Sequence, residues 1–404
     1  MKKLFAVLLA FTALCAFTPA QAKAAAQEPI VIGSIFDQVG IAAPIGQGLL
    51  RGAQVAIAVV NEDGGLFGRK VELYNIDAQS DPTLIANATS RLINELKVPC
   101  IVGLEDDSLA SASGPIAQQA QTVLLVGSAT TPTIPSMGDY VFLNAFGDNV
   151  QGRAAAKFAV DKLGWKKVAV IRDSASAYSV DTVKFFSQAF REYTKDDKAV
   201  VHEENYQTGD TNFTAQLTRL RTVMAREKID GILLAPPFPQ DAPILAKQMV
   251  SLRINLPVLM TDGGDDQSVI DIGGKAVEGF IVATHFSADG DLSDAGKKFV
   301  SKYKEMFKSD SGAFECLGYD GVMTLVEAIN VIGQQKWDSM SLEQKRTAIR
   351  DTMQSHKFVT TALPKHYARP SETDFPRTAI KPIIFLKFTN DQRVYEDEIG
   401  PDEL

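Results

Sequence analysis

The sequence is poor in cysteine and histidine and has no surplus of positive charge. Three Cys and four His occur among 404 residues, and 41 Lys and Arg stand against 49 Asp and Glu, for a net charge of −8. Without a basic stripe, nucleic acid is not expected as a partner. The low Cys count excludes a disulfide scaffold. With 45% hydrophobic and only 22% charged residues, a largely disordered chain is also excluded.

Motifs of enzymes and metal sites are missing as well. The sequence contains no G-x-S-x-G, H-E-x-x-H, G-x-x-x-x-G-K-[ST] or C-x-x-C. His202, His285, His356 and His366 lack the spacing of paired metal ligands, so solvent-facing or core roles are expected. The glycine-rich stretch 64–68 follows a predicted helix instead of a strand, which favours a structural turn over a phosphate loop. We therefore expect no metal, no cofactor and no catalytic residue.

The N-terminus has the three parts of a secretory signal. Lys2 and Lys3 precede an apolar run over 4–17, and Ala20 and Ala22 supply the small residues of a cleavage site. The run is too short for a permanent membrane anchor, and no later stretch reaches ~18 uninterrupted apolar residues. The sequence predicts an exported protein that is cleaved near Ala22 and is not embedded in a membrane.

Export leaves the pairing of the cysteines open. Cys15 would leave with the signal, so Cys100 and Cys316 remain. An oxidising compartment permits a disulfide between them. Both lie in apolar surroundings, which favours buried free thiols that act as small hydrophobic residues.

The length exceeds what one hydrophobic core usually organises, so at least two lobes are expected. Short β-branched runs alternate with segments of helical period, which is typical of parallel sheets covered by helices. Strands are predicted at 30–36, 71–77, 100–103, 122–126, 168–172, 200–206, 231–235 and 257–260. Helices are predicted at 45–60, from Pro82, and at 108–120, 148–163, 180–193, 212–228 (capped by Asp210 or Thr211) and 241–252. No flexible linker divides the two halves.

The informative polar segments directly follow predicted strands. The stretch 103–108 enters a helix, and Asp107 or Ser108 can cap that helix or leave its free amides to hold an anion. The stretch 127–132 is also rich in hydroxyl groups. Since carboxyl ends of parallel strands meet at one edge of a sheet, the two segments predict a polar grip for a small ligand.

Taken in order along the chain, these pieces resemble a known family, the periplasmic solute-binding proteins of the Leu/Ile/Val-binding type, which are receptors of ABC importers. The resemblance covers most of the mature chain. It rests on the order and spacing of the segments 30–36, Gly48-Leu-Leu-Arg-Gly-Ala-Gln54, 60–70, Asp77-Ala-Gln-Ser-Asp-Pro82, 102–103, Ser128-Ala-Thr-Thr-Pro132, Asp173 with Tyr178, Gly209-Asp-Thr-Asn-Phe213, Asp262-Gly263, 277–279 and Ser311-Gly-Ala-Phe314.

The resemblance implies an α/β fold of the type I periplasmic-binding-protein class, with two lobes, each a parallel sheet flanked by helices, and a ligand cleft between them. One lobe would comprise 28–147 and 286–365, and the other 148–285 and 366–404. The implied function is a periplasmic receptor, monomeric and not an enzyme. It would capture a small polar ligand (an amino acid or a related carboxylate or amide) and deliver it to a membrane permease.

The resemblance also implies which residues contact the ligand. Hydroxyls and amides at Asp107 or Ser108, at Ser128 and at Thr130 would hold a ligand carboxylate. Asp262 would hold the ligand ammonium, and Tyr178 would close over the ligand from the second lobe. Phe314 would pack against the ligand side chain. Phe238 lies in a Pro-rich loop, 236–239, that replaces one usually carrying a tyrosine.

The sequence departs from the family pattern around this site. Glu105, Asp106 and Asp107 stand where a Ser/Thr run is usual, and three acids beside a carboxylate site would repel the ligand unless they face solvent or bind a cation. Ile45 replaces a tyrosine, and Gln79 and Asp106 occupy the places of a small disulfide. The identity of the ligand is therefore open.

Two other functions remain open, and one segment has no assigned role. The first alternative is a ligand-sensing module of a signalling system with the same fold. The second is an exported hydrolase that uses Asp262 with an activated hydroxyl, disfavoured because the sequence places no histidine or lysine base near a nucleophile. Residues 341–376 extend the chain beyond shorter family members, and the sequence assigns them no role.

Overall fold

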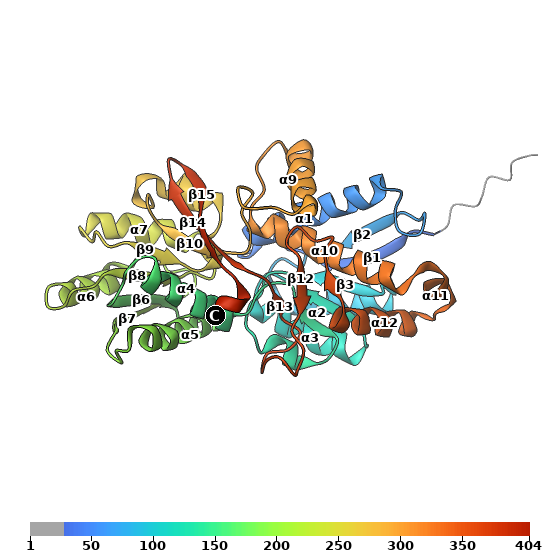
Figure 1. Ribbon diagram of the computed structural model, residues 1–404, viewed down its shortest axis with the longest axis horizontal. Coiled ribbons are helices and arrows are strands. Elements are labelled where there is room, and N and C mark those ends of the chain that lie inside the picture. The colour runs from blue at the N-terminus through green and yellow to red at the C-terminus, as the bar shows by residue number, and fades with distance from the viewer. Residues whose placement is uncertain (1–27) are drawn as a thin grey trace, which may run out of the picture.

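The protein has two lobes that lie side by side (Figure 1). The computed structural model describes residues 28–404, so the expected signal sequence, its cleavage site and Cys15 lie outside the described residues. The first lobe is built on a parallel sheet in the order β2-β1-β3-β4-β5. In chain order its elements are β1 (Ile30–Ile35), α1 (Ala43–Glu62), β2 (Val71–Asn75), α2 (Pro82–Asn94), β3 (Cys100–Gly103), α3 (Asp107–Gln119), β4 (Val123–Val126), η1 (Ile134–Met137) and β5 (Val141–Leu143).

The second lobe has a seven-stranded sheet in the order β15-β14-β10-β9-β8-β6-β7. Its parallel part follows the predicted alternation: α4 (Asp148–Asp161), β6 (Val168–Asp173), α5 (Ala177–Thr194), β7 (Val200–Tyr206), α6 (Thr214–Met224), β8 (Gly231–Ala235), α7 (Asp241–Ser251), β9 (Val258–Met260), η2 (Asp262–Gly264), α8 (Gln267–Gly273), η3 (Gly274–Ala276) and β10 (Ile281–Thr284). The C-terminal strands β14 (Ile383–Thr389) and β15 (Gln392–Ile399) join its edge antiparallel, and η4 (Pro401–Glu403) follows.

Between these segments the chain returns to the first lobe. This return comprises α9 (Asp294–Phe307), α10 (Ala313–Ile332), α11 (Gln334–Ser339), α12 (Leu342–Ser355) and a small antiparallel sheet of β11 (Lys357–Phe358), β12 (Lys365–Tyr367) and β13 (Ala379–Ile380). Helix α10 packs closely on α1 at Gly52. A Cβ at this position would lie 1.8 Å from the Glu315 carbonyl oxygen, so only glycine allows this approach. By length and composition α1 passes as a membrane span, but most of it is buried in this lobe, as in a core helix.

Three segments carry the chain between the lobes: the residues between β5 and α4, the residues after β10, and the residues between β13 and β14. Phe146 of the first segment stacks on His285 of the second, with ring centroids 3.8 Å apart. Lys381 of the third lies with its ammonium 5.8 Å from the Phe146 ring, and burial lowers its pKa to about 8. The chain enters the second sheet at Ile383, later than the expected crossing at 366, because Tyr367 packs in the core of the first lobe.

Local boundaries differ from the sequence predictions where capping decides them. Helix α5 begins at Ala177 instead of Val180, because the Ser176 side chain accepts a hydrogen bond from the Ser179 amide. Helix α6 spans Thr214–Met224, shorter than predicted. Neither Asp210 nor Thr211 caps it; the Thr214 amide donates to the Asn212 side chain instead (3.0 Å). The stretch 64–68 is a structural turn, as predicted, with positive φ at Gly65.

Both cysteines in the described part of the chain are free and buried. Cys100 lies in β3 and Cys316 in α10. Burial raises the pKa of the Cys100 thiol to about 12, so the thiol stays protonated. The expectation of buried free thiols is confirmed.

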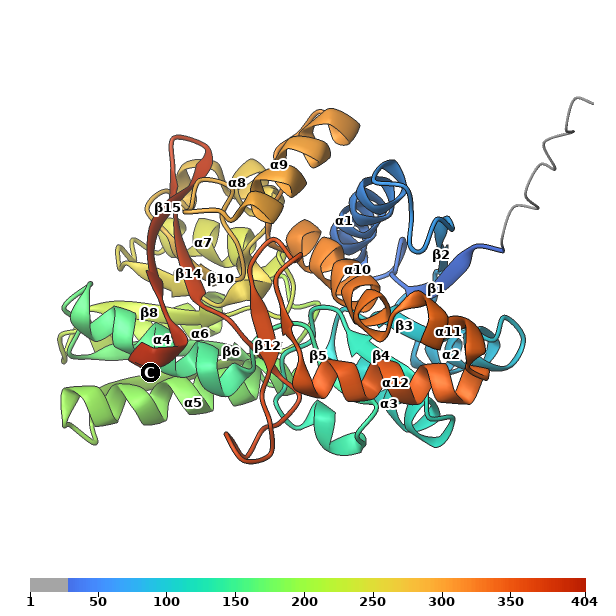
Figure 2. The same ribbon diagram turned by 45° about the vertical axis from the view of Figure 1, so that its right-hand side comes forward.

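The extension 341–376 forms α12 and the strands β11 and β12 of the small sheet, which cover the first lobe (Figure 2). Arg346 anchors α12, and the residue is only 6% exposed. Its guanidinium donates to the carbonyls of Val98 (2.9 Å), Ile93 (3.2 Å) and Ala120 (3.4 Å). These carbonyls end α2 and α3 or lie beside them, so Arg346 satisfies acceptors that those helix ends leave open.

We expect Arg346→Met to lower the free energy of unfolding by about 2–4 kcal/mol, because buried carbonyls lose their donor. Urea unfolding followed by circular dichroism measures this loss. Arg369→Ala is the matched control, since Arg369 only forms an exposed pair with Glu372 and should change stability by less than about 1 kcal/mol. Equal effects of the two substitutions would contradict an anchoring role for Arg346.

Candidate functional site

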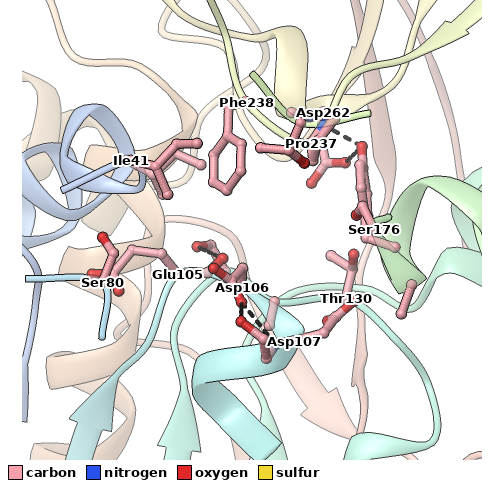
Figure 3. A pocket seen from close by; sticks show the side chains of 18 of the residues that line it. Ile41, Ser80, Glu105, Asp106, Asp107, Thr130, Ser176, Pro237, Phe238 and Asp262 are labelled. Atoms are coloured by element: carbon pink, nitrogen blue, oxygen red, sulfur yellow. Dashed lines mark hydrogen bonds between the residues drawn. The ribbon is translucent and has the colours of Figure 1, made fainter. Parts of the chain in front are cut away.

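A cavity of about 390 Å³ lies between the lobes. Loops that follow β3 and β4 line it from the first lobe, and loops that follow β6, β8 and β9 line it from the second (Figure 3). The cavity therefore sits at the carboxyl ends of strands, where ligands bind in open α/β sheets. Its volume is that of a pocket for a small molecule.

All eight residues that the sequence analysis selected line this one cavity. Five come from the first lobe, after β3 and β4 and at the start of α10, and three come from the second lobe. They are Asp107, Ser108, Ser128, Thr130, Phe314, Tyr178, Phe238 and Asp262. Glu105, Asp106 and Ile45, which depart from the family pattern, line it too. The fold brings the set together, and ligand contact by these residues stays a prediction.

The carboxylate of Asp262 is the most firmly held group in the cavity wall. Asp262 follows β9 and is 3% exposed. Its Oδ1 accepts hydrogen bonds from Gln151 Nε2 and from the Tyr178 hydroxyl, each at 2.6 Å, and its Oδ2 lies 2.8 Å from His285 Nε2. The donors come from α4, from α5 and from the segment after β10, so three separate parts of the chain orient this one side chain.

These contacts keep Asp262 ionised. Burial alone would raise its pKa, but the hydrogen bonds from His285, Tyr178 and Gln151 outweigh burial and hold the pKa below its ordinary value. Burial, with the nearby charge of Lys381, lowers the pKa of His285 to about 4. His285 is therefore neutral at pH 7 and donates its Nε2–H to the carboxylate.

His285 is the site residue that sequence reasoning missed. It was assigned a solvent-facing or core role, and it is fully buried, but it also contacts Asp262 directly. Its one usable signal was position, because it directly follows β10 at the carboxyl end of a strand, as the other site residues follow theirs. Nothing in the sequence pairs it with an aspartate 23 residues away.

The acidic segment after β3 does not face solvent as three free charges. Asp106, not Asp107 or Ser108, caps α3: its Oδ1 accepts from the amides of Ser108 (2.7 Å) and Leu109 (3.1 Å). Asp107 is buried and accepts from the Thr131 amide (3.2 Å) and hydroxyl (2.5 Å). Glu105 is 3% exposed and accepts from the Asp37 amide (2.9 Å).

Comparison with known proteins identifies the family of this chain. The family model described as periplasmic binding protein matches residues 29–379. The chain belongs to the periplasmic binding protein family. It is 23% identical over 304 residues to the Leu/Ile/Val-binding protein of Escherichia coli K12, which covers 75% of this chain and 80% of that protein. The resemblance stated from the sequence is thereby confirmed.

Solved structures agree on the fold. The leucine-binding protein of Thermotoga maritima superposes with a TM-score of 0.81 at 28% identity, covering 93% of this chain and all of that one. A solute-binding protein of an ABC transporter from Rhodopseudomonas palustris, solved with 3,4-dihydroxybenzoic acid, gives 0.78 at 21% identity, covering 93% of this chain and 99% of that one. The two-lobed α/β fold and the role of a solute-binding receptor are both confirmed.

Apolar side chains complete the wall of this binding protein. Phe314 in the first turn of α10 and Ile45 in α1 are buried in the first lobe. Phe238 comes from the second lobe after β8, yet it belongs to the same hydrophobic cluster as Phe314. Figure 3 shows Phe238 next to Ile41, across the cavity from Asp107. The aromatic rings provide an apolar surface between the acidic groups.

We expect Tyr178→Phe to destabilise the protein by about 1–2 kcal/mol at pH 7, because Asp262 loses a donor and the Gly263 amide loses its acceptor (3.1 Å). The folded-state pKa of Asp262 is depressed, so hydrogen bonds to its carboxylate stabilise the fold above the ordinary carboxyl pKa of about 4. This contribution is lost as the pH falls through the folded-state value.

Chemical denaturation at a series of pH values measures the difference between Tyr178→Phe and wild type. The difference should shrink at acidic pH. Tyr74→Phe is the control, since Tyr74 makes only an exposed contact with Arg91 (3.3 Å). A difference that stays constant from neutral to acidic pH would show that the Tyr178 hydroxyl does not act through the Asp262 carboxylate.

Proposed function

We propose that this binding protein works in the periplasm as the receptor of an ABC importer, where it traps a small polar solute between its lobes and presents it to a membrane permease. The single observation that carries the proposal is the cavity whose wall is shared by both lobes and contains Asp262. The proposal includes export with cleavage near Ala22, a monomeric receptor, and no chemical change of the solute.

Because residues from both lobes line the cavity, binding of the solute favours closure of the cleft. The first lobe contributes Ser108, Ser128, Thr130 and Phe314, and the second contributes Asp262 with others. A ligand shifts a conformational equilibrium only by its difference in affinity between the two states. A solute that touches both walls gains contacts only in the closed state, and this difference drives hinge closure.

Asp262 is proposed as the counter-charge for a positively charged group of the solute. It remains ionised although buried, since its oxygens are hydrogen-bonded by neutral donors and by no lysine or arginine in the described part of the chain. A carboxylate whose charge is not neutralised by the protein is a strong partner for an ammonium group.

A hydrolase is the weaker alternative, even though Asp262 and His285 form the pair found in catalytic triads. His285 is fully buried behind Asp262 and does not line the cavity. Its Nδ1 has no hydrogen-bond partner in residues 28–404, so no serine or threonine hydroxyl is in place as a nucleophile. The sensory alternative shares every feature of the site and differs only in the protein that the closed receptor contacts.

We expect Asp262→Asn to weaken solute binding by about 2–5 kcal/mol, the usual cost of breaking a buried charge pair. A thermal-shift panel of amino acids, amides, diamines and small carboxylates selects the best-binding compound, because a ligand of the native state raises the melting temperature by mass action. Isothermal titration then gives its affinity for each variant. Asp161→Asn is the control, since Asp161 forms only a surface pair with Lys157. Unchanged affinity in Asp262→Asn would remove the assigned role of Asp262.

We expect the selected compound to reduce the radius of gyration in small-angle scattering, because the lobes close on it. Tyr178→Ala should weaken this compaction and speed dissociation in stopped-flow measurements, as losses of contact mostly act on the off-rate. If Tyr178→Ala instead lowers only the melting temperature of the free protein and leaves the dissociation rate unaltered, the ring packs α5 and does not hold the solute.

A further inference from the structure

Most of the donors expected to grip a ligand carboxylate are already used inside the chain. The first amides of α3 are the groups that a helix N-terminus offers to an anion. Here Asp106 takes them, with the Ser108 amide at 2.7 Å and the Leu109 amide at 3.1 Å, and it also accepts from the Ser108 hydroxyl at 2.6 Å. The protein's own carboxylate thus fills the anion position at this helix.

The loop after β4 is occupied in the same way. Asp107 accepts from the amide and the hydroxyl of Thr131, which leaves neither for a ligand. The Ser128 hydroxyl donates to the Glu105 carbonyl at 3.0 Å. Of the hydroxyls expected to hold a carboxylate, those of Ser108 and Ser128 are thus used by the protein itself. The Thr130 hydroxyl has no partner in residues 28–404 and remains open to either class of ligand.

The side chains that line the cavity also disfavour a ligand carboxylate. Four carboxyl groups line the cavity (Glu105, Asp106, Asp107 and Asp262), and its lining, all within the described residues, contains no lysine, arginine or histidine. Asp148 adds a fifth carboxyl group behind Asp107, since its Oδ2 lies 3.3 Å from the same Thr131 hydroxyl. A ligand carboxylate would find no cationic side chain in this wall and would lie in the same cavity as the ionised Asp262.

One buried acceptor in the cavity wall remains open, and the ionised Asp262 lies on the other side of the cavity. Glu105 is nearly fully buried, and its Oε2 has no hydrogen-bond partner in residues 28–404, although Glu105 lines the cavity. Figure 3 shows Glu105 near Ser80 on one side of the cavity and Asp262 on the other, with Phe238 between and above them. A buried acceptor without a donor is destabilising, so a ligand donor is favoured at this end.

We propose, resting on the receptor function above, that the solute is an organic cation with two basic nitrogens and no carboxylate, such as a diamine or a guanidino-amine. One cationic end binds Asp262, and the other binds the Glu105 and Asp107 side of the cavity. The apolar linker lies against Phe238 and Phe314, whose ring faces also attract cations.

The direction of proton transfer on binding distinguishes a cationic ligand from an anionic one. Burial raises the pKa of Asp107 to about 6, and burial together with Asp37 raises that of Glu105 well above its ordinary value. The charged groups facing these two are all acids: Asp37 after β1 and Asp106 before α3, with Asp148 in α4 beside Asp107. A bound cation favours the ionised carboxylates and releases protons, whereas a bound anion takes protons up.

The test is isothermal titration of the full mature chain at pH 7 in two buffers of different ionisation enthalpy. The probes are α,ω-diamines of three to five carbons, the ω-amino acids of the same lengths, leucine and benzoate. We expect a diamine to bind at least about tenfold more tightly than the ω-amino acid of its length, with proton release. Its affinity should fall below about pH 6, where Asp107 becomes protonated.

Variants locate the second cationic end. Glu105→Gln and Asp107→Asn should each weaken diamine binding at least about tenfold. Both variants are measured so that the test does not depend on the folding of one of them, and circular dichroism checks the fold of each. Glu227→Gln, an exposed acid outside the cavity, is the matched control and should leave the affinity unchanged.

Each contrary result overturns a specific claim. Tighter binding of leucine, benzoate or an ω-amino acid, accompanied by proton uptake, overturns the two-cation ligand. If that binding is lost in Asp262→Asn, the receptor function stands without it. Diamine binding that is insensitive to both Glu105→Gln and Asp107→Asn also overturns the inference. Failure of every probe to bind overturns the inference alone, because the thermal-shift panel tests the receptor function with a wider set of compounds.

Discussion

Buried carboxylates without a cationic side chain beside them are the constraint on which the site depends. Each such group must find hydrogen-bond donors or lose its charge. Asp262 finds neutral donors on three different elements of the chain, and Asp106 and Asp107 take the amides and hydroxyls at the carboxyl ends of β3 and β4. Hydrogen bonds therefore hold these acidic groups in place, and no cationic side chain of the lining offsets the charge of Asp262. A solute that neutralises this charge completes the structure electrostatically.

The same contacts couple the site to the hinge. His285 holds Asp262 on one side and stacks on Phe146 on the other, and both residues lie in segments that pass between the lobes. Lys381, in the third such segment, lies against the Phe146 ring. A change at the Asp262 carboxylate is therefore transmitted to the segments that pass between the lobes through side chains in direct contact, without an intervening loop. This arrangement gives a physical route by which occupation of the cavity and the angle between the lobes depend on each other.

Local patterns in the sequence predicted most of the fold, and the resemblance selected residues that the fold brings to one cavity, while their contact with a ligand stays a prediction. Alternating β-branched and helical segments indicated two parallel sheets, and polar loops after strands indicated where Asp107 and Ser128 would lie. What the sequence did not reveal depends on distant partners. Asp106 caps α3 because it has the extended backbone of an N-cap, whereas Asp107 already lies in the helix and accepts from the distant Thr131. The role of His285 requires the fold to bring β10 beside β9, and no local pattern encodes that pairing.

The central claim is that the cavity holds a cation between carboxylates that the protein does not neutralise. The most direct measurement is mass spectrometry of the solute that the protein retains when it is purified from its own periplasm without denaturation and then released with acid. The account predicts a small organic cation with two basic nitrogens, bound one per chain. A retained molecule that carries a free carboxylate, whether an amino acid or an aromatic acid, would contradict it.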